Sequence, residues 1–153
     1  MTDALHTLLD REAITDVRYR FALALDTRDW ALFDTLFADG GEVDADLSAV
    51  GSPRRTMPKA ELAALFQYSF RRPASENPTQ QLYGNVLIEV DGDMATCRSY
   101  LVGHHYIPGF EDGDEAVLRA RYMDRLTRTL SGWKITATTL HVFSVTGNPR
   151  ILA

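Results

Sequence analysis

The sequence predicts an α+β domain, with helices from its first part packed on one face of a curved, mostly antiparallel sheet. Apolar residues recur at every third or fourth position over the first third of the chain, the spacing of an amphipathic helix. From Gln80 onward the spacing changes to the alternation typical of strands, and turn signals separate the runs. Helices first and a meander of strands afterwards is an α+β order. A sheet that curls around helices leaves a hollow at its open end, which suits a small apolar ligand.

Three helices are predicted before the strands. In the first, charged residues such as Arg18 lie between the apolar positions and are expected to face solvent. Asp29 is a suitable N-cap for the second helix, which Gly40-Gly41 is expected to end. Pro58 opens the third helix, where its missing N–H costs little. The apolar face of the first helix is expected to comprise Leu5, Leu8, Leu9, Ile14, Val17, Phe21 and Leu25.

Four long strands are predicted after the helices, joined by tight turns. Asp91-Gly92 is a strong signal for a two-residue hairpin, and Ser131-Gly132 marks a second turn. Before the third helix, residues 42–47 are expected to form a short strand and residues 51–55 a loop. The long strands are expected at residues 82–90, 94–107, 117–130 and 133–145.

Length and composition set the broad class of protein. The 153 residues fit a single domain, and a hydrophobic content of 45% is enough for a packed core. A net charge of −5 without any basic cluster argues against nucleic acid and against an anionic membrane surface as partners. The N-terminus does not resemble a secretory signal, and no apolar run approaches the roughly 20 residues of a membrane span. A cytoplasmic protein is therefore expected.

Motifs for cofactors and metals are not found in the sequence. Cys97 is the single cysteine, which excludes an internal disulfide and a zinc site built from several thiolates. Glycine-rich phosphate loops, GxSxG elbows and CxxC pairs do not occur. We therefore expect no cofactor and no metal.

Asp26 is the most informative candidate for chemistry. It ends the apolar face of the first helix, where an unpaired buried carboxylate would cost several kcal/mol. It therefore needs a hydrogen-bonding or cationic partner, or a polar cavity. His104, near the end of a strand-like run, is a candidate partner, and a carboxylate with an imidazole in an apolar pocket makes a general base. The alternative for Asp26 is a local bond to backbone N–H groups at the helix end.

Four short segments carry a resemblance to a known family, and they are Leu25-Asp-Thr-Arg-Asp-Trp30, Gly84 to Ala95, Tyr122-Met-Asp124 and Gly132-Trp-Lys-Ile135. Together they resemble the SnoaL-like branch of the nuclear transport factor 2-like superfamily, which includes scytalone dehydratase. The match covers nearly the whole chain, so residues 1–153 are expected to form a single domain of this type. The resemblance implies a conical α+β barrel with a deep apolar pocket between the long helix and the sheet.

The resemblance also implies roles for individual residues. The aspartate and strand histidine that hydrogen-bond in scytalone dehydratase correspond to Asp26 and His104. The second histidine of that site corresponds to Gln81, and its two tyrosines fall on Leu25 and near Ala45. The adjacent histidines His104 and His105 must point to opposite faces of their strand. Parity alone leaves open which one faces the pocket, and the resemblance selects His104.

Four further residues are candidates for contacting a substrate. Tyr19 lies seven residues before Asp26, on roughly the same helix face, although core packing explains it equally well. Gln81 can present its amide to a ligand oxygen. Tyr122 and Asp124 share one face of a strand, where polar groups can line a pocket. The alternative for Asp124 is an ion pair with an arginine on a strand, the available ones being Arg98, Arg119, Arg121 and Arg125.

Two functions are compatible with these residues. The first is a cofactor-independent enzyme of the lyase or isomerase type, acting as a dehydratase, isomerase or cyclase on a small apolar oxygenated ring compound. In it, His104 removes a proton next to a carbonyl, Asp26 orients the imidazole, and Tyr122 or Gln81 holds the oxyanion. The second is a non-catalytic module, either a small-molecule binder or an association subunit like those of ring-hydroxylating oxygenases.

A homodimer or homotrimer is expected under either function. The sheet has two faces and the helices can cover only one, so an apolar outer face would require a partner. Leu101, Leu140 and Val142 are expected on that outer face.

Overall fold

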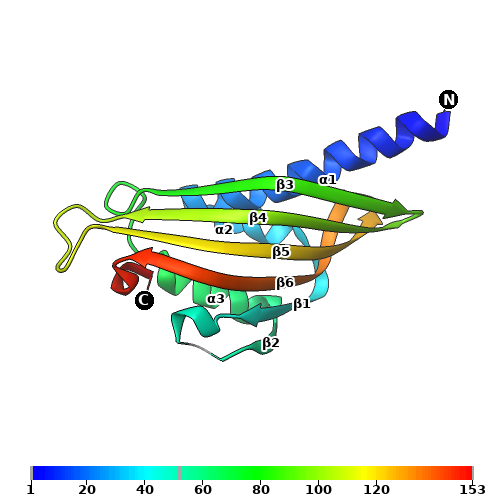
Figure 1. Cartoon of the computed structure of the whole chain (residues 1–153). Coiled ribbons are helices and arrows are strands. Elements are labelled where there is room, and N and C mark those ends of the chain that lie inside the picture. The colour runs from blue at the N-terminus through cyan, green and yellow to red at the C-terminus, as the bar shows by residue number, and fades with distance from the viewer. Residues whose placement is uncertain (1, 52, 153) are drawn as a thin grey trace.

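The computed structural model describes residues 2–51 and 53–152, and its helices and strands follow the predicted order (Figure 1). Helix α1 is the longest element, and the four C-terminal strands form most of the sheet. The elements in chain order are α1 (Thr2–Thr27), α2 (Trp30–Thr35), β1 (Phe37–Asp46), η1 (Ser48–Val50), β2 (Arg55–Pro58), α3 (Lys59–Ser69), β3 (Thr79–Asp91), β4 (Met94–Tyr106), β5 (Glu115–Thr129), β6 (Gly132–Gly147) and η2 (Pro149–Leu152).

The six strands form one open sheet in the order β2-β1-β6-β5-β4-β3. The four long strands pair as an antiparallel meander, whereas β1 runs parallel to β6 at the other side. Helix α1 lies behind β3, and α3 lies behind the β6 and β1 side (Figure 1). All three helices therefore cover the same face, and the predicted fold class is confirmed, with a curved sheet that does not close into a full barrel.

The region between α1 and α3 differs from the prediction. Helix α2 is capped by Asp29, whose carboxylate accepts a bond from the N–H of Leu32 at 2.9 Å, but it ends at Thr35 instead of at the glycine pair. Strand β1 already begins at Phe37, because it pairs with the buried β6 strand. Gly40, at φ +72°, lies in a register shift of this pairing, so the glycines form a bulge within a strand. Strand β2 replaces part of the predicted loop.

The core lies between the helices and the inner face of the sheet. A cluster of phenylalanine rings forms its centre, in which Phe21 of α1 lies with its ring centroid 5.1 Å from that of Phe33 and 6.1 Å from that of Phe37. Such aromatic contacts bury a large apolar area on few side chains. The first turns of α1 extend past the end of the sheet, so the predicted core residues Leu5, Leu8 and Leu9 are exposed.

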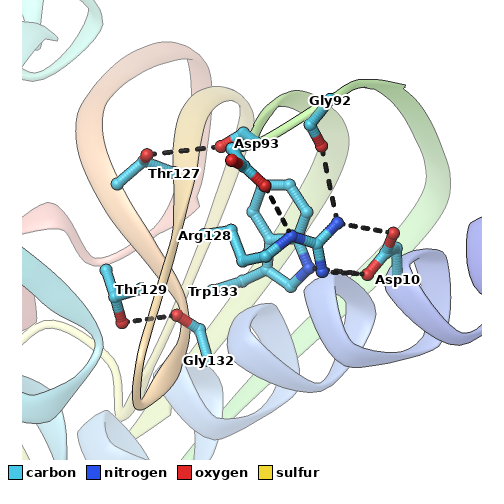
Figure 2. A network of polar contacts seen from close by, with 8 residues as sticks. All are labelled: Asp10, Gly92, Asp93, Thr127, Arg128, Thr129, Gly132 and Trp133. Atoms are coloured by element: carbon cyan, nitrogen blue, oxygen red, sulfur yellow. Dashed lines mark hydrogen bonds and ion pairs between the residues drawn. The ribbon is translucent and has the colours of Figure 1, made fainter.

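An arginine on β5 fastens α1 to the ends of two strand hairpins (Figure 2). The guanidinium of Arg128 donates two bonds to the carboxylate of Asp10, at 2.6 and 2.8 Å, and a third to the carboxylate of Asp93 at 2.9 Å. It also lies 4.5 Å from the ring centroid of Trp133, whose indole N–H donates to Asp10. This contact fixes the position of α1 at the end of the sheet near the β3–β4 turn.

None of the helices within the described part of the chain is both long and apolar enough to cross a bilayer.

Candidate functional site: an apolar pocket with one polar end

A pocket of about 260 Å³ lies between α3, the end of α1 and the inner face of the sheet. Helix α3 contributes one wall, strands β4 to β6 contribute the opposite wall, and Pro149 and Leu152 of the C-terminal η2 segment complete it. The lining is mostly apolar and includes Leu25, Phe66, Leu101 and Val142. Small-molecule sites usually range from roughly 300 to 1,000 Å³, so this pocket suits a ligand of one or two rings.

The two adjacent histidines of β4 point to opposite faces, and His105 is the one that faces inward. His105 lines the pocket and its side chain is 5% exposed. His104 lies on the outer face, where its side chain is 37% exposed and its Nε2 atom lies 3.8 Å from a carboxylate oxygen of Glu115. The resemblance therefore selected the wrong neighbour. His105 shares its face of β4 with Cys97 and Leu101, and the burial of these residues identifies this face as the inner one.

Asp26 bonds to β3 and has no contact with His104. One carboxylate oxygen accepts from the hydroxyl of Thr79 at 2.8 Å, and the other accepts from the backbone N–H of Gln81 at 3.1 Å. Partial burial raises the pKa of Asp26, although both hydrogen bonds favour its charged form. Asp26 thus fastens the end of α1 to the first residues of β3, directly behind the polar end of the pocket.

Two buried polar atoms at that polar end have no hydrogen-bond partner among the described residues. They are Nε2 of Gln81 and Nδ1 of His105. A buried polar group without a partner costs roughly 1–3 kcal/mol, so such groups call for an explanation. Gln81 of β3 pairs with Gly103 of β4. A Cβ atom added to Gly103 would lie 2.9 Å from the side-chain amide oxygen of Gln81. The missing side chain of Gly103 is what leaves room for this amide.

The imidazole of His105 is held in its neutral form. Burial lowers the pKa of His105 to about 4, and the positive charge of Arg28 acts in the same direction. The ring of Phe70 lies against it, with the two ring centroids 5.1 Å apart. His105 therefore offers an uncharged nitrogen to the pocket at neutral pH.

Tyr122 and Asp124 are both buried on the inner face of β5, but only Tyr122 lines the pocket. Asp124 forms a buried ion pair with Arg18 of α1 and accepts a bond from the hydroxyl of Thr138. The guanidinium carbon of Arg18 lies 4.3 Å from the ring centroid of Tyr122. The predicted partner on a strand is therefore wrong for Asp124, and Arg18 does not face solvent.

Tyr19 and Cys97 have no place in the pocket. The side chain of Tyr19 is 53% exposed, because α1 turns this side away from the sheet. Cys97 is buried, and burial raises the pKa of its thiol to about 11, so it stays protonated at neutral pH. Within residues 2–51 and 53–152, no three or more His, Cys, Asp or Glu side chains gather as metal ligands would.

Sequence reasoning missed three residues that shape the site: Arg18, Arg28 and His105. Arg28 belongs to one of the segments that carried the resemblance, yet a charged residue just after a helix is usually solvated. For Arg18, the one available signal was its position between Ile14 and Phe21, within the apolar face.

A long helix on an open curved sheet, with an apolar pocket between them, defines a class of small-ligand domains. The model of the SnoaL-like domain matches residues 6–139, and the chain belongs to this family.

Comparison with solved structures shows the same fold in other proteins. The Kfla4162 protein from Kribbella flavida has a TM-score of 0.80 at 21% identity, over 95% of this chain and 98% of that one. A protein from Novosphingobium aromaticivorans, provisionally named an aromatic ring hydroxylase, has a TM-score of 0.75 at 25% identity, over 95% and 98%. Another from the same organism, provisionally named a scytalone dehydratase, has a TM-score of 0.73 at 19% identity, over 97% and 92%. Among curated proteins, none matches this sequence.

Proposed function

We propose that the pocket binds a small, uncharged ring compound that carries a carbonyl oxygen, and that His105 removes a proton from the carbon next to it. The observation that carries this proposal is the pair of unpartnered buried atoms, Gln81 Nε2 and His105 Nδ1, at one end of an otherwise apolar cavity. A ligand oxygen at that end would give the amide of Gln81 its missing acceptor. The apolar walls would hold the ring.

The chemistry follows from the two polar groups. In the tautomer protonated at Nε2, the Nδ1 atom of His105 has a free lone pair and can accept the proton of a C–H bond. The electron pair of that bond moves onto the carbonyl oxygen, where Gln81 stabilises the developing negative charge. Return of the proton from His105 to a different carbon completes an isomerisation. Transfer of that proton to a hydroxyl on the carbon beside the deprotonated one, so that the hydroxyl leaves as water, completes a dehydration. Asp26 contributes indirectly, because its carboxylate accepts a hydrogen bond from the backbone N–H of Gln81 and so fixes the position of that backbone.

The low basicity of His105 narrows the class of substrate. A weak base transfers protons efficiently only from a comparatively acidic C–H bond. This favours ring ketones whose C–H bond is activated twice, by the carbonyl and by an adjacent aryl or second carbonyl group. Two of the similar structures carry names that refer to ring compounds or to dehydration, which supports this class without identifying a substrate.

Proton exchange tests the proposal without knowledge of the natural substrate. The protein is incubated in D₂O with 2-tetralone, a two-ring ketone with doubly activated protons, and deuterium uptake is followed by NMR. We expect catalysed exchange that falls by about 10²- to 10⁴-fold in His105→Gln, the usual contribution of a general base. Gln81→Leu removes the amide while nearly conserving volume and is expected to lower the rate as well.

His104→Gln is the matched control, because it makes the same substitution one residue away on the opposite face of the strand. It should exchange 2-tetralone as fast as the unmodified protein. Loss of exchange in His104→Gln and not in His105→Gln would overturn the proposal. Saturable binding of 2-tetralone with no exchange at all would instead support the non-catalytic binding module.

A further inference from the structure

Arg28 makes an unusual number of bonds for a residue between two helices. Its guanidinium donates to the backbone oxygens of Leu25 and Asp26, at 2.7 and 3.1 Å, at the end of α1. It also donates to the hydroxyl of Thr79 at 3.0 Å and to the carbonyl of Asn77 at 2.7 Å. One side chain thus joins the end of α1, the loop after α3 and the start of β3.

The backbone of Arg28 adopts a conformation that side chains usually avoid. Its φ of +61° lies in the left-handed region, where residues other than glycine, asparagine and aspartate are uncommon. A glycine would fit this turn without strain. Because an arginine occupies this strained position, we infer that the bonds of its side chain are needed there. Backbone strain of this kind is concentrated at functional sites.

The guanidinium of Arg28 also supports the wall of the pocket. The guanidinium carbon lies 4.9 Å from the ring centroid of Phe70. The Phe70 ring in turn packs against the imidazole of His105, with the two ring centroids 5.1 Å apart. The Phe70 ring thereby contacts both the guanidinium of Arg28 and the imidazole of the proposed base. Phe70 and His105 both line the pocket, and Arg28 stands behind them.

We propose that Arg28 is a positioning residue for the polar end of the pocket, which ties the end of α1, residues 70–78 and β3 together and holds Phe70 against His105. It would act through these contacts without touching the ligand. This inference rests on the proposed function only for its effect on turnover. Its effect on His105 can be measured in the ligand-free protein.

The surroundings of His105 determine what the charge of Arg28 does. Arg28 and the neighbouring His104 both disfavour protonation of His105. Asp26 lies beside Arg28 and partly offsets its charge, but its oxygens are taken up by Thr79 and Gln81. Tyr122, on β5 across the pocket, is an uncharged phenol because burial raises its pKa. Arg28 is therefore the cation that helps to keep the base unprotonated and ready to accept a proton.

Two substitutions separate the charge of Arg28 from its bonds. Arg28→Gln removes the charge while keeping an amide that can bond to carbonyls. An NMR titration of the His105 ring should show its pKa rise from about 4 by about half a unit or more, as expected when a nearby positive charge that disfavours protonation is removed. Arg28→Lys keeps the charge but cannot bond to several oxygens in one plane. In Arg28→Lys, the pKa of His105 should therefore stay low, while the backbone amides of residues 70–78 should lose protection from hydrogen exchange.

Arg128→Gln is the matched control, because Arg128 also fastens α1 to the sheet but at the end away from the pocket. It should lower the melting temperature and leave the His105 titration unchanged. An unchanged His105 pKa in Arg28→Gln, or an equal shift in Arg128→Gln, would overturn the proposal. If Arg28→Gln does not fold, unchanged protection of residues 70–78 in Arg28→Lys would overturn it. These readouts need no ligand, so they remain distinct from failure of the exchange assay.

Discussion

Arg18 places a positive charge in a site where its side chain is only 1% exposed. The carboxylate of Asp124 compensates that charge, and the rings of Phe21, Tyr83 and Tyr122 surround the guanidinium at 4.6, 5.0 and 4.3 Å. Its Nε atom has no hydrogen-bond partner among the residues that the structure describes. A buried ion pair of this kind adds little net stability, whereas removing one member leaves an uncompensated charge in the core.

Arg18→Met should therefore destabilise the protein by about 3–5 kcal/mol, measured by denaturant unfolding. The double variant Arg18→Met/Asp124→Leu removes both charges and should recover at least half of that loss. A double variant no more stable than the single one would show that the charge of Asp124 is not the source of the cost.

His105 should make the stability of the protein depend on pH. Its pKa is about 4 in the folded protein, against roughly 6.5 when unfolded, so the unfolded chain binds more protons between these values. The stabilisation due to neutral His105 is complete above pH 6.5 and is lost as the pH falls towards 4. The shift corresponds to a loss on the order of 3 kcal/mol.

Comparison with His105→Leu isolates this contribution, because Asp26 has the opposite effect. Its raised pKa stabilises the fold at low pH, and that part is lost as the pH rises. Unfolding free energies of the two proteins should diverge with rising pH between 4 and 6.5, the unmodified protein showing the steeper rise. Parallel curves would mean that folding does not lower the pKa of His105.

At the scale of the elements, helix α1 is attached to the sheet by arginines at three places. Arg128 reaches it from β5 near the β3–β4 turn, and Arg28 holds its C-terminal end against β3 (Figure 2 shows the former). Between them, the ion pair of Arg18 with Asp124 joins the middle of the helix to the sheet. The position of the helix, and with it the depth of the pocket, is thus set by polar contacts as well as by the aromatic core.

Arg128→Gln should lower the melting temperature, because it removes the paired bonds to Asp10 and the stacking on Trp133. The loss should shrink at high salt, since the contact is near the surface and ions screen it. Arg20→Gln is a suitable comparison, as Arg20 of the same helix makes only a surface pair with Asp16. An equal change in both variants would mean that the contact in Figure 2 adds nothing beyond an ordinary surface ion pair.

At the scale of the whole molecule, the outer face of the sheet carries large apolar side chains that no helix covers. Tyr100, Val102, Met123 and Phe143 are 40–50% exposed on it. The residues expected there from the sequence, Leu101, Leu140 and Val142, are instead buried on the inner face. The outer face is thus apolar as expected, but other residues than the predicted ones make it so. We still expect a second or third copy of the chain to cover this face.

Light scattering on the purified protein should give a mass of two or three times the chain mass of 17.1 kDa. Met123→Lys places a charge at the centre of the outer face and should shift the mass towards a single chain. Leu9→Lys, on the exposed first turns of α1, is the comparison and should leave the mass unchanged if the sheet is the interface. A single-chain mass for the unmodified protein would rule the oligomer out.

The sequence by itself determined the order of the elements, the helices on one face of the sheet and the family. The family was indicated by the combined resemblance of several short segments. Local signals were sufficient for the order of the elements, because hydrophobic spacing and turn residues report directly on nearby backbone structure. The same signals failed at Gly40-Gly41, where pairing with β6 extended a strand over residues expected to end a helix.

Only the tertiary structure decided which polar residues meet. Strand alternation required His104 and His105 to face opposite ways, but the packing of α1 and α3 determined which face is the inside. Asp124 bonds to Arg18, 106 residues away, and Arg28 bonds to Asn77 and Thr79, which are 49 and 51 residues away. Such contacts depend on how whole helices and strands pack against one another. The spacing of residues along the sequence does not show which distant residues this packing brings together.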